Sequence, residues 1–95
     1  MFTYYKSSGE KTSSGAIKTS EGFLGGAIVL TDGTNDATVI LYDNDNAASG
    51  TKLFEVTVAG ADNYGGLVLP VPIRFDNGCY LSISGTGASC IIYYL

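Results

Sequence analysis

The feature that most constrains this fold is a short apolar run enclosed by clusters of turn-forming residues. Between Thr31 and Leu53, one strand-like segment lies between two stretches rich in Asp, Asn, Gly and Ser. Thirteen glycines punctuate the 95-residue chain at near-regular intervals. Apolar residues nowhere recur at helical spacing over a helical length. The pattern therefore predicts short β-strands joined by sharp turns, and no helix.

Runs of β-forming residues bounded by turn signals predict eight strands. Strands at intervals of roughly 8–12 residues are typical of a β-sandwich or small barrel. We therefore expect an all-β fold, a single small antiparallel β-sandwich of jelly-roll-like or Greek-key type with about 7–8 strands, spanning residues 1–95. The predicted strands are Phe2–Ser7, Ala16–Ser20, Phe23–Thr31, Ala37–Asp43, Lys52–Ala59, Leu67–Phe75, Cys79–Ser84 and Ala88–Tyr94.

The segment Leu67–Phe75 shows the clearest alternation, with apolar side chains at every second position on one face. Pro70 and Pro72 are two residues apart, so their missing N–H groups lie on the same edge of the strand. Proline is tolerated there only where that edge has no hydrogen-bonded neighbour. The segment is predicted to be an edge strand, or a strand that abuts another subunit through its side chains.

Turn signals at Asp76–Gly78 and Ser84–Gly87 predict that the chain from Leu67 to Tyr94 is a meander. In its last hairpin, Cys79 and Cys90 would lie opposite or diagonal to each other on the inward face. A cross-strand disulfide is geometrically conceivable. Two buried free thiols are favoured, because a cytoplasm keeps thiols reduced.

The segment Lys6–Gly15 (KSSGEKTSSG) is polar, small and rich in serine. Such a composition is typical of flexible connections. We expect a flexible arm or a loop between two strands here. The sequence ends in CIIYYL, which is so apolar that it must pack in a sheet or against a neighbour.

Charge and hydropathy exclude several partners. The formal net charge of −4 argues against nucleic acid, which is bound by clustered Lys and Arg. No apolar run approaches the ~20 residues of a membrane helix. The N-terminal MFTYYKSSGEK lacks the apolar core of a signal peptide, so synthesis in a cytoplasm is expected. Only 15% of residues are charged and 45% are hydrophobic, which favours assembly over a free monomer.

The chain has no histidine, the commonest general base and metal ligand. Systems that pair serine or cysteine with histidine therefore cannot be built, and we expect no enzyme, no catalytic residue and no cofactor. A carboxylate pair of the glycosidase type stays formally open, although a domain this small rarely supplies the cleft.

The acidic residues fall at turns, and strand length places them in two groups at opposite ends of the sandwich. The segment beginning at Asp43 resembles a calcium loop only at its start, because Ala48 and Phe54 stand where the EF-hand needs Gly and Glu. We interpret the acids as turn formers and expect no metal site. A cation shared around a symmetry axis remains the alternative. The two groups are Asp32, Asp36 and Asp62, and Asp43, Asp45 and Asp76.

Seven tyrosines and four phenylalanines form either a sugar-stacking platform or subunit contacts. Alternation with Val and Ile marks Phe54 and Phe75 as core residues. For the remaining aromatic and edge positions we favour subunit contact over glycan contact. The candidate interface residues are Tyr4, Tyr5, Tyr64, Pro70, Pro72, Tyr80, Tyr93 and Leu95.

Three blocks of the chain, TDGTNDATVILYDNDNAASGTKL, VTVAG and NGCYLSISGTGASCIIYY, resemble segments of small bacteriophage structural proteins. The resemblance covers roughly Gly22 to Tyr94. It implies a virion protein of the head or tail, such as a capsid decoration protein or a tail or fibre module. Proteins of this group usually act as homo-oligomers, often trimers. The resemblance implies no set of catalytic residues for this chain.

We therefore expect a non-enzymatic structural component of a bacteriophage virion, made in the host cytoplasm. A capsid decoration, cement or other head-associated protein that acts through subunit contacts is the leading interpretation. The alternative is a tail or fibre-associated module that binds a receptor or glycan. The expected partners are further copies of the chain and other virion proteins, with neither nucleic acid nor membrane.

Overall fold

The structure is a computed structural model that describes residues 4–95. Its elements are eight β-strands and one turn of 3₁₀ helix, η1 (Gly60–Asp62). No helix in this range has the length and hydropathy needed to cross a membrane. The strands are β1 (Lys6–Lys11), β2 (Gly15–Lys18), β3 (Gly22–Leu30), β4 (Ala37–Tyr42), β5 (Lys52–Val58), β6 (Tyr64–Phe75), β7 (Cys79–Ser84) and β8 (Ser89–Tyr94).

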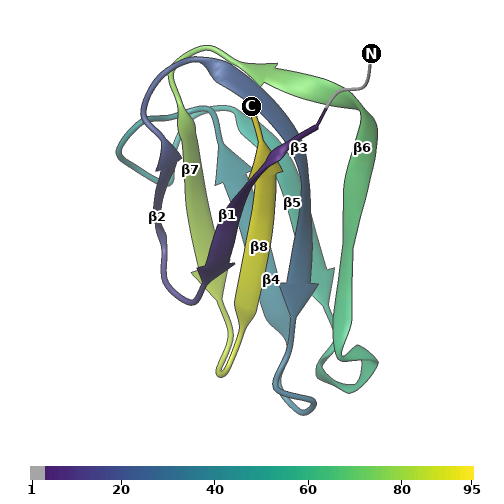
Figure 1. Cartoon of the computed structure of the whole chain (residues 1–95). Helices are drawn as coiled ribbons and strands as arrows, with labels where there is room; N and C mark the ends of the chain where they lie inside the picture. Colours follow the sequence, from purple (N-terminus) through teal and green to yellow (C-terminus); the bar gives the residue numbers. More distant parts are fainter. Residues whose placement is uncertain (1–3) are drawn as a thin grey trace.

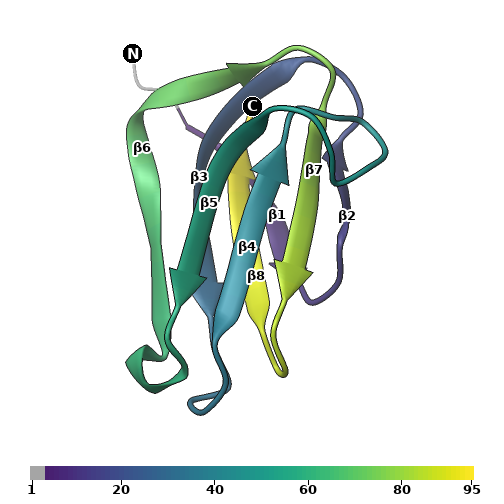
Figure 2. The same cartoon turned by 180° about the vertical axis from the view of Figure 1, so that it is seen from behind.

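The strands form two four-stranded antiparallel sheets that pack face to face (Figures 1 and 2). Sheet A has the order β1-β8-β3-β6, and sheet B has the order β2-β7-β4-β5. The chain pairs β4 with β5, β3 with β6, β2 with β7 and β1 with β8. This nesting is that of one long hairpin rolled into two layers, which is the jelly roll. The expected all-β sandwich is confirmed.

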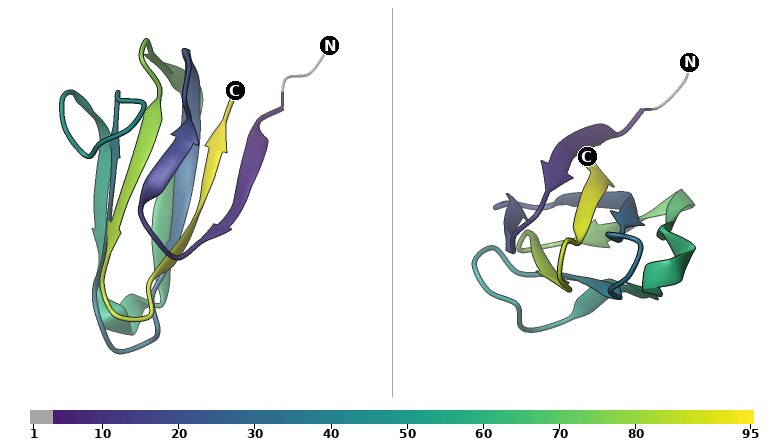
Figure 3. Two further views of the ribbon diagram at one scale, coloured as in Figure 1. Left: turned by 90° about the vertical axis from the view of Figure 1, so that its left-hand side faces the viewer. Right: turned by 90° about the horizontal axis from the view of Figure 1, so that it is seen from below.

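Inward-pointing residues at alternate positions of the strands build the core between the two sheets. Figure 3 shows the two sheets edge-on and from below. In β4, for example, Ala37, Val39 and Leu41 are fully buried, and the residues between them are only partly buried. Phe75 is the largest fully buried side chain, as expected, and Phe54 packs at the margin of the core. The other fully buried apolar residues are Leu24, Ala27, Val29, Cys79, Leu81, Cys90 and Ile92.

The polar segment predicted as an arm or loop contains a strand. Residues Lys6–Lys11 form β1, which pairs with β8 at the edge of sheet A. A bulge interrupts the pairing at Gly9, which has a φ of 72°, and the Ser8 hydroxyl accepts a hydrogen bond from the Ile92 N–H. Composition misled the prediction because β1 is held by backbone pairing and contains no apolar side chain. Part of the predicted strand Phe2–Ser7 lies outside the described residues.

The predicted meander and its last hairpin are wrong. Strand β7 lies in sheet B, whereas β6 and β8 lie in sheet A, so the Ser84–Gly87 turn crosses between the layers. Cys79 and Cys90 therefore belong to different sheets and are not cross-strand neighbours. Both are buried free thiols, as favoured from the sequence. The edge position of Leu67–Phe75 is confirmed, because β6 ends sheet A.

Candidate interaction surface

The outward side of sheet A is largely apolar along β6, β3 and β8, whereas β1 at its edge places Glu10 directly opposite Ile91. Ile28 lies between the buried Ala27 and Val29, and Ile91 lies between the buried Cys90 and Ile92, so alternation turns both isoleucines outward. Their strands pair, and Ile28 is directly opposite Ile91. The same register aligns outward residues on β6, β3 and β8. We call this surface the sheet A outer face, and it comprises Ile28, Leu30, Tyr64, Val68, Ile91 and Tyr93.

Exposure varies across the sheet A outer face: Tyr64 and Val68 are largely exposed, and the other four side chains are half-buried. Tyr64 is 69% exposed and Val68 is 51% exposed. Ile28 and Ile91 are partly buried by their neighbours, but neither belongs to the core or packs against it. Monomeric proteins rarely expose contiguous apolar surface of this kind unless it is functional.

The outward side of sheet B differs in chemistry. Thr38 and Thr57 share a hydroxyl–hydroxyl hydrogen bond of 2.9 Å across β4 and β5. Lys52 Nζ donates a 3.1 Å hydrogen bond to the Glu55 carboxylate, and this hydrogen bond raises the pKa of the lysine. Tyr80 lies on this sheet, directly opposite Tyr42. One broad side of the sandwich is thus largely apolar, and the other is largely polar.

Strand β6 bulges out of its pairing with β3 at a corner next to the apolar face. Between Ile73, opposite Leu24, and Val68, opposite Gly26, its residues 69–72 face a single residue of β3, Gly25. An open hollow of about 460 Å³ lies there, and beside it Val71 is 76% exposed. We call this region the β6 corner. Its lining residues are Tyr5, Leu69, Pro70, Pro72 and Leu95.

Tyr5 closes one side of the β6 corner. Its ring lies so close to Gly25 that an added Cβ would be 2.5 Å from the ring carbon Cδ1. Its hydroxyl donates a 3.0 Å hydrogen bond to the Leu69 carbonyl. The bulged segment of β6 therefore has a fixed partner on the strand-β1 side of the sheet. The regular alternation expected along Leu67–Phe75 is interrupted at this bulge.

The structure brings together four of the candidate interface residues, because Tyr5, Pro70, Pro72 and Leu95 all line the hollow at the β6 corner. Tyr64 and Tyr93 lie on the sheet A outer face, and Tyr4 is 71% exposed just before β1. Tyr80 lies on sheet B. Because Tyr64 and Tyr80 project from opposite sheets, they do not form one sugar-stacking platform.

Sequence reasoning missed the centre of the apolar face, namely Ile28, Leu30, Val68 and Ile91. A signal was present in the sequence. The runs Phe23–Leu30 and Cys90–Tyr94 are apolar at consecutive positions, whereas a strand covered on one face alternates apolar and polar residues. Such runs indicate strands that need cover on both faces.

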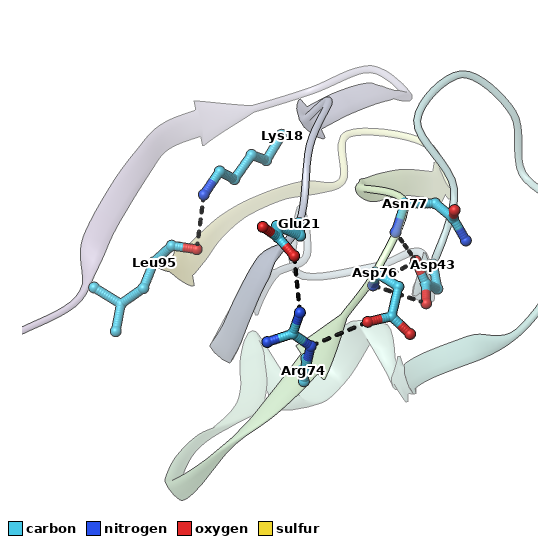
Figure 4. A network of polar contacts seen from close by, with 7 residues as sticks. All are labelled: Lys18, Glu21, Asp43, Arg74, Asp76, Asn77 and Leu95. Atoms are coloured by element: carbon cyan, nitrogen blue, oxygen red, sulfur yellow. Dashed lines mark hydrogen bonds and ion pairs between the residues drawn. The ribbon is translucent and has the colours of Figure 1, made fainter.

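A polar network joins the loops at the end of the sandwich where β6 meets β7 (Figure 4). The Asp43 carboxylate accepts hydrogen bonds from the backbone N–H groups of Asp76 at 3.1 Å and Asn77 at 2.8 Å. Burial, the largest single influence, raises the pKa of Asp43, but the backbone donors together outweigh it, so the net pKa is lowered. Asp43 therefore fixes the turn between β6 and β7, which is distant in the sequence. Asn44 stabilises its own loop, because its side-chain oxygen accepts a hydrogen bond from the Asn46 N–H.

Arg74 extends this network, and Lys18 makes a separate polar contact (Figure 4). The Arg74 guanidinium pairs with Glu21 at 2.8 Å and with Asp76 at 3.0 Å, and it lies 5.9 Å from the centre of the Phe23 ring. Lys18 Nζ donates to the Leu95 carbonyl at 3.3 Å. These contacts connect neighbouring segments of the chain, and both Glu21 and Asp76 are paired with Arg74.

The acids lie at the two ends of the sandwich, as the strand lengths predicted. At the end opposite Asp43, Asp32 accepts from the N–H groups of Thr34 and Asn35, and Asp36 accepts from Gly60 N–H. Among residues 4–95, no three His, Cys, Asp or Glu side chains gather in a way that could hold a metal ion. Asp32, Asp36 and Asp43 thus act as clamps on turns and loops.

Comparisons of this chain with protein-family models, curated proteins and solved structures find no match. A jelly roll alone does not define an activity, since the same architecture occurs in capsid, lectin and enzyme domains. We therefore infer the function from the surfaces of this molecule.

Proposed function

We propose that this protein is a non-enzymatic structural component of a bacteriophage virion, a capsid decoration or other head-associated protein that acts through subunit contacts. The observation that carries the proposal is the sheet A outer face, a broad apolar surface on a chain with few charges. Together with the β6 corner, it supplies the apolar cover that protein–protein contacts require.

The resemblance of residues 22–94 to small phage structural proteins supports the assignment of this chain to a phage particle. The jelly-roll topology adds a fold-level analogy, because this architecture recurs in viral capsids. The head-associated assignment follows the leading interpretation of the sequence, with tail or fibre as its alternative.

The chemistry of the surface is also that of a contact site. The hollow at the β6 corner is lined by apolar side chains, and its one hydroxyl, on Tyr5, already donates to a backbone carbonyl. The sequence supplies no histidine to act as a general base. Adhesion through complementary shape is the mechanism that these residues support.

Purified particles of the phage that encodes this chain test the proposal. We expect the chain to be detected in them by mass spectrometry at a fixed copy number, and recombinant chain to rebind particles that lack it. Ile91→Lys on the sheet A outer face should abolish rebinding, whereas Ile40→Lys on sheet B should not. Absence of the chain from purified particles, combined with failure to rebind, would refute the proposal.

A further inference from the structure

The turn between β6 and β7 contains a chemically reactive pair of residues. Asn77 precedes Gly78, and no other asparagine of the chain is followed by glycine. In such a pair, the backbone nitrogen of the glycine attacks the carbonyl carbon of the asparagine side chain, because glycine has no Cβ to obstruct the approach. Asn77 is therefore the asparagine of this chain whose local sequence most favours spontaneous deamidation.

Deamidation needs only water as a second reactant. The Gly78 nitrogen gives up its proton and forms a bond to the Asn77 Cγ, while the bond from that carbon to the side-chain nitrogen breaks and ammonia leaves. Water then opens the resulting succinimide ring. Attack at one carbonyl of the ring gives aspartate, and attack at the other gives isoaspartate, whose main chain is one carbon longer. The product is a covalent modification that the chain cannot reverse by itself.

The folded turn restrains the atoms that react. The Asp43 carboxylate accepts hydrogen bonds from the Asn77 N–H at 2.8 Å and the Asp76 N–H at 3.1 Å (Figure 4). Burial raises the pKa of Asp43, and the backbone N–H groups of Asn77, Asp76 and Gly78 lower it as hydrogen-bond donors. The Gly78 N–H, which loses its proton in deamidation, is thus directed at a carboxylate. A negative charge beside this group opposes the loss of its proton.

Packing around Gly78 also holds its nitrogen in place. Gly78 is buried, although Asn77 is exposed. A Cβ added at Gly78 would lie 2.7 Å from the Lys18 carbonyl oxygen and 2.9 Å from the Asp45 Cα. The end of β2 and the loop between β4 and β5 therefore enclose this residue. The Gly78 nitrogen reaches the Asn77 Cγ only when the turn opens locally.

We propose that Asn77 is a deamidation site, and that the hydrogen bonds from the turn to Asp43, the Asp43 clamp, protect it while the turn is closed. The inference is independent of the proposed virion role, since it concerns a covalent change within one chain. The turn joins sheet A to sheet B, and an added main-chain carbon would displace the N–H groups that face Asp43. Formation of isoaspartate therefore makes a transient opening of the turn permanent.

Peptide mapping by mass spectrometry tests this inference on the purified full chain, incubated in mildly alkaline buffer. Trypsin releases residues 75–95, in which Asn77 is the only amide side chain, so a change from amide to acid in this peptide reports Asn77 alone. We expect folded Asp43→Asn to deamidate there at least about fivefold faster than wild type, because loss of a charged acceptor makes opening more frequent. Asp45→Asn, which removes the same charge from an exposed neighbour, should keep the wild-type rate.

Wild-type protein in denaturant supplies a second measurement, which is valid even if Asp43→Asn fails to fold. Because unfolding releases the clamp, we expect Asn77 to deamidate more than about tenfold faster in the denatured chain than in the native one. Equal rates in these two states would overturn the inference. Equal acceleration by Asp45→Asn and Asp43→Asn would also overturn it. Slower deamidation in folded Asp43→Asn would show instead that Asp43 acts as a base toward the Gly78 N–H.

Discussion

Ile28 on β3 and Ile91 on β8 are directly opposite each other, and neither packs against the core. The adjacent cross-strand pair, Ala27 and Ile92, is fully buried between the sheets. One pair of strands thus presents aliphatic side chains to both sides of sheet A. Packing in the core accounts for the inward aliphatic side chains. The outward aliphatic side chains are the basis of the proposed function.

The contact between Tyr5 and Gly25 should be sensitive to a single methyl group. Gly25→Ala would push the Tyr5 ring away and loosen its hydrogen bond to Leu69. We expect a loss of about 1–3 kcal/mol in the free energy of unfolding, measured by urea denaturation. Gly15→Ala is the matched control, because an added Cβ there meets nothing within 4 Å. Equal losses in the two variants would contradict a specific Tyr5 contact.

Asp43 should make stability fall at acidic pH. Its folded-state pKa is lowered, so its contribution is present above the unfolded value of about 3.9 and is lost as the pH falls through the lower folded value. Asp43→Asn should cost about 1 kcal/mol at pH 7, because a charged acceptor becomes neutral. The difference from wild type should shrink below about pH 4. Thermal melting across pH checks this.

Asp45→Asn is the control for that series, since Asp45 is an exposed neighbour of Asp43 in the same loop. It should leave the pH profile close to that of wild type. If Asp45→Asn and Asp43→Asn change the profile equally, the Asp43 clamp on the β6–β7 turn has no particular role.

The two cysteines should be inert in the folded protein. Burial, with a smaller contribution from Asp43, raises the pKa of Cys79 to about 12, and burial raises the pKa of Cys90 to about 11. Little thiolate is therefore present at pH 8. We expect slow reaction with a thiol reagent in native buffer and prompt reaction of both groups in denaturant. Fast labelling of the native chain would contradict this burial.

Pro70 and Pro72 should limit aggregation at the β6 edge. Replacing both with valine restores two N–H donors at a sheet edge and adds β-forming residues. We expect faster growth of thioflavin-positive aggregates at equal thermal stability. Val71→Ile is a control that changes the same segment without adding a donor. No difference in aggregation between the double variant and wild type would show that the prolines do not guard this edge.

Most strands could be predicted from the sequence because their inward residues alternate and Gly, Asn and Asp mark the turns. The connection Ser84–Gly87 was misread for a physical reason. A short glycine-containing turn can join two strands of one sheet or carry the chain across to the other sheet, and the inward alternation of Leu81 and Ile92 is the same in both cases. Only the pairing of β7 with β4, and of β8 with β3, separates the two.

The candidate surface was predictable in part. Pro70 and Pro72 indicated an edge strand, and apolar residues beside them indicated contact. Local sequence could not show that Tyr5 reaches Leu69, because the two residues are brought together by the pairing of distant strands. Nor did the tyrosine count reveal the aliphatic centre around Ile28 and Ile91, whose signal was the loss of alternation.

An electron-microscopy map of the proposed phage particle, in which this jelly roll can be fitted, tests the proposed virion role most directly. We expect to find the domain on the particle with its sheet A outer face, including Ile91, buried against protein and with the Thr38–Thr57 side of sheet B less covered. Finding the domain on the particle with Ile28 and Ile91 facing solvent, or not finding it there at all, would refute the proposed contact.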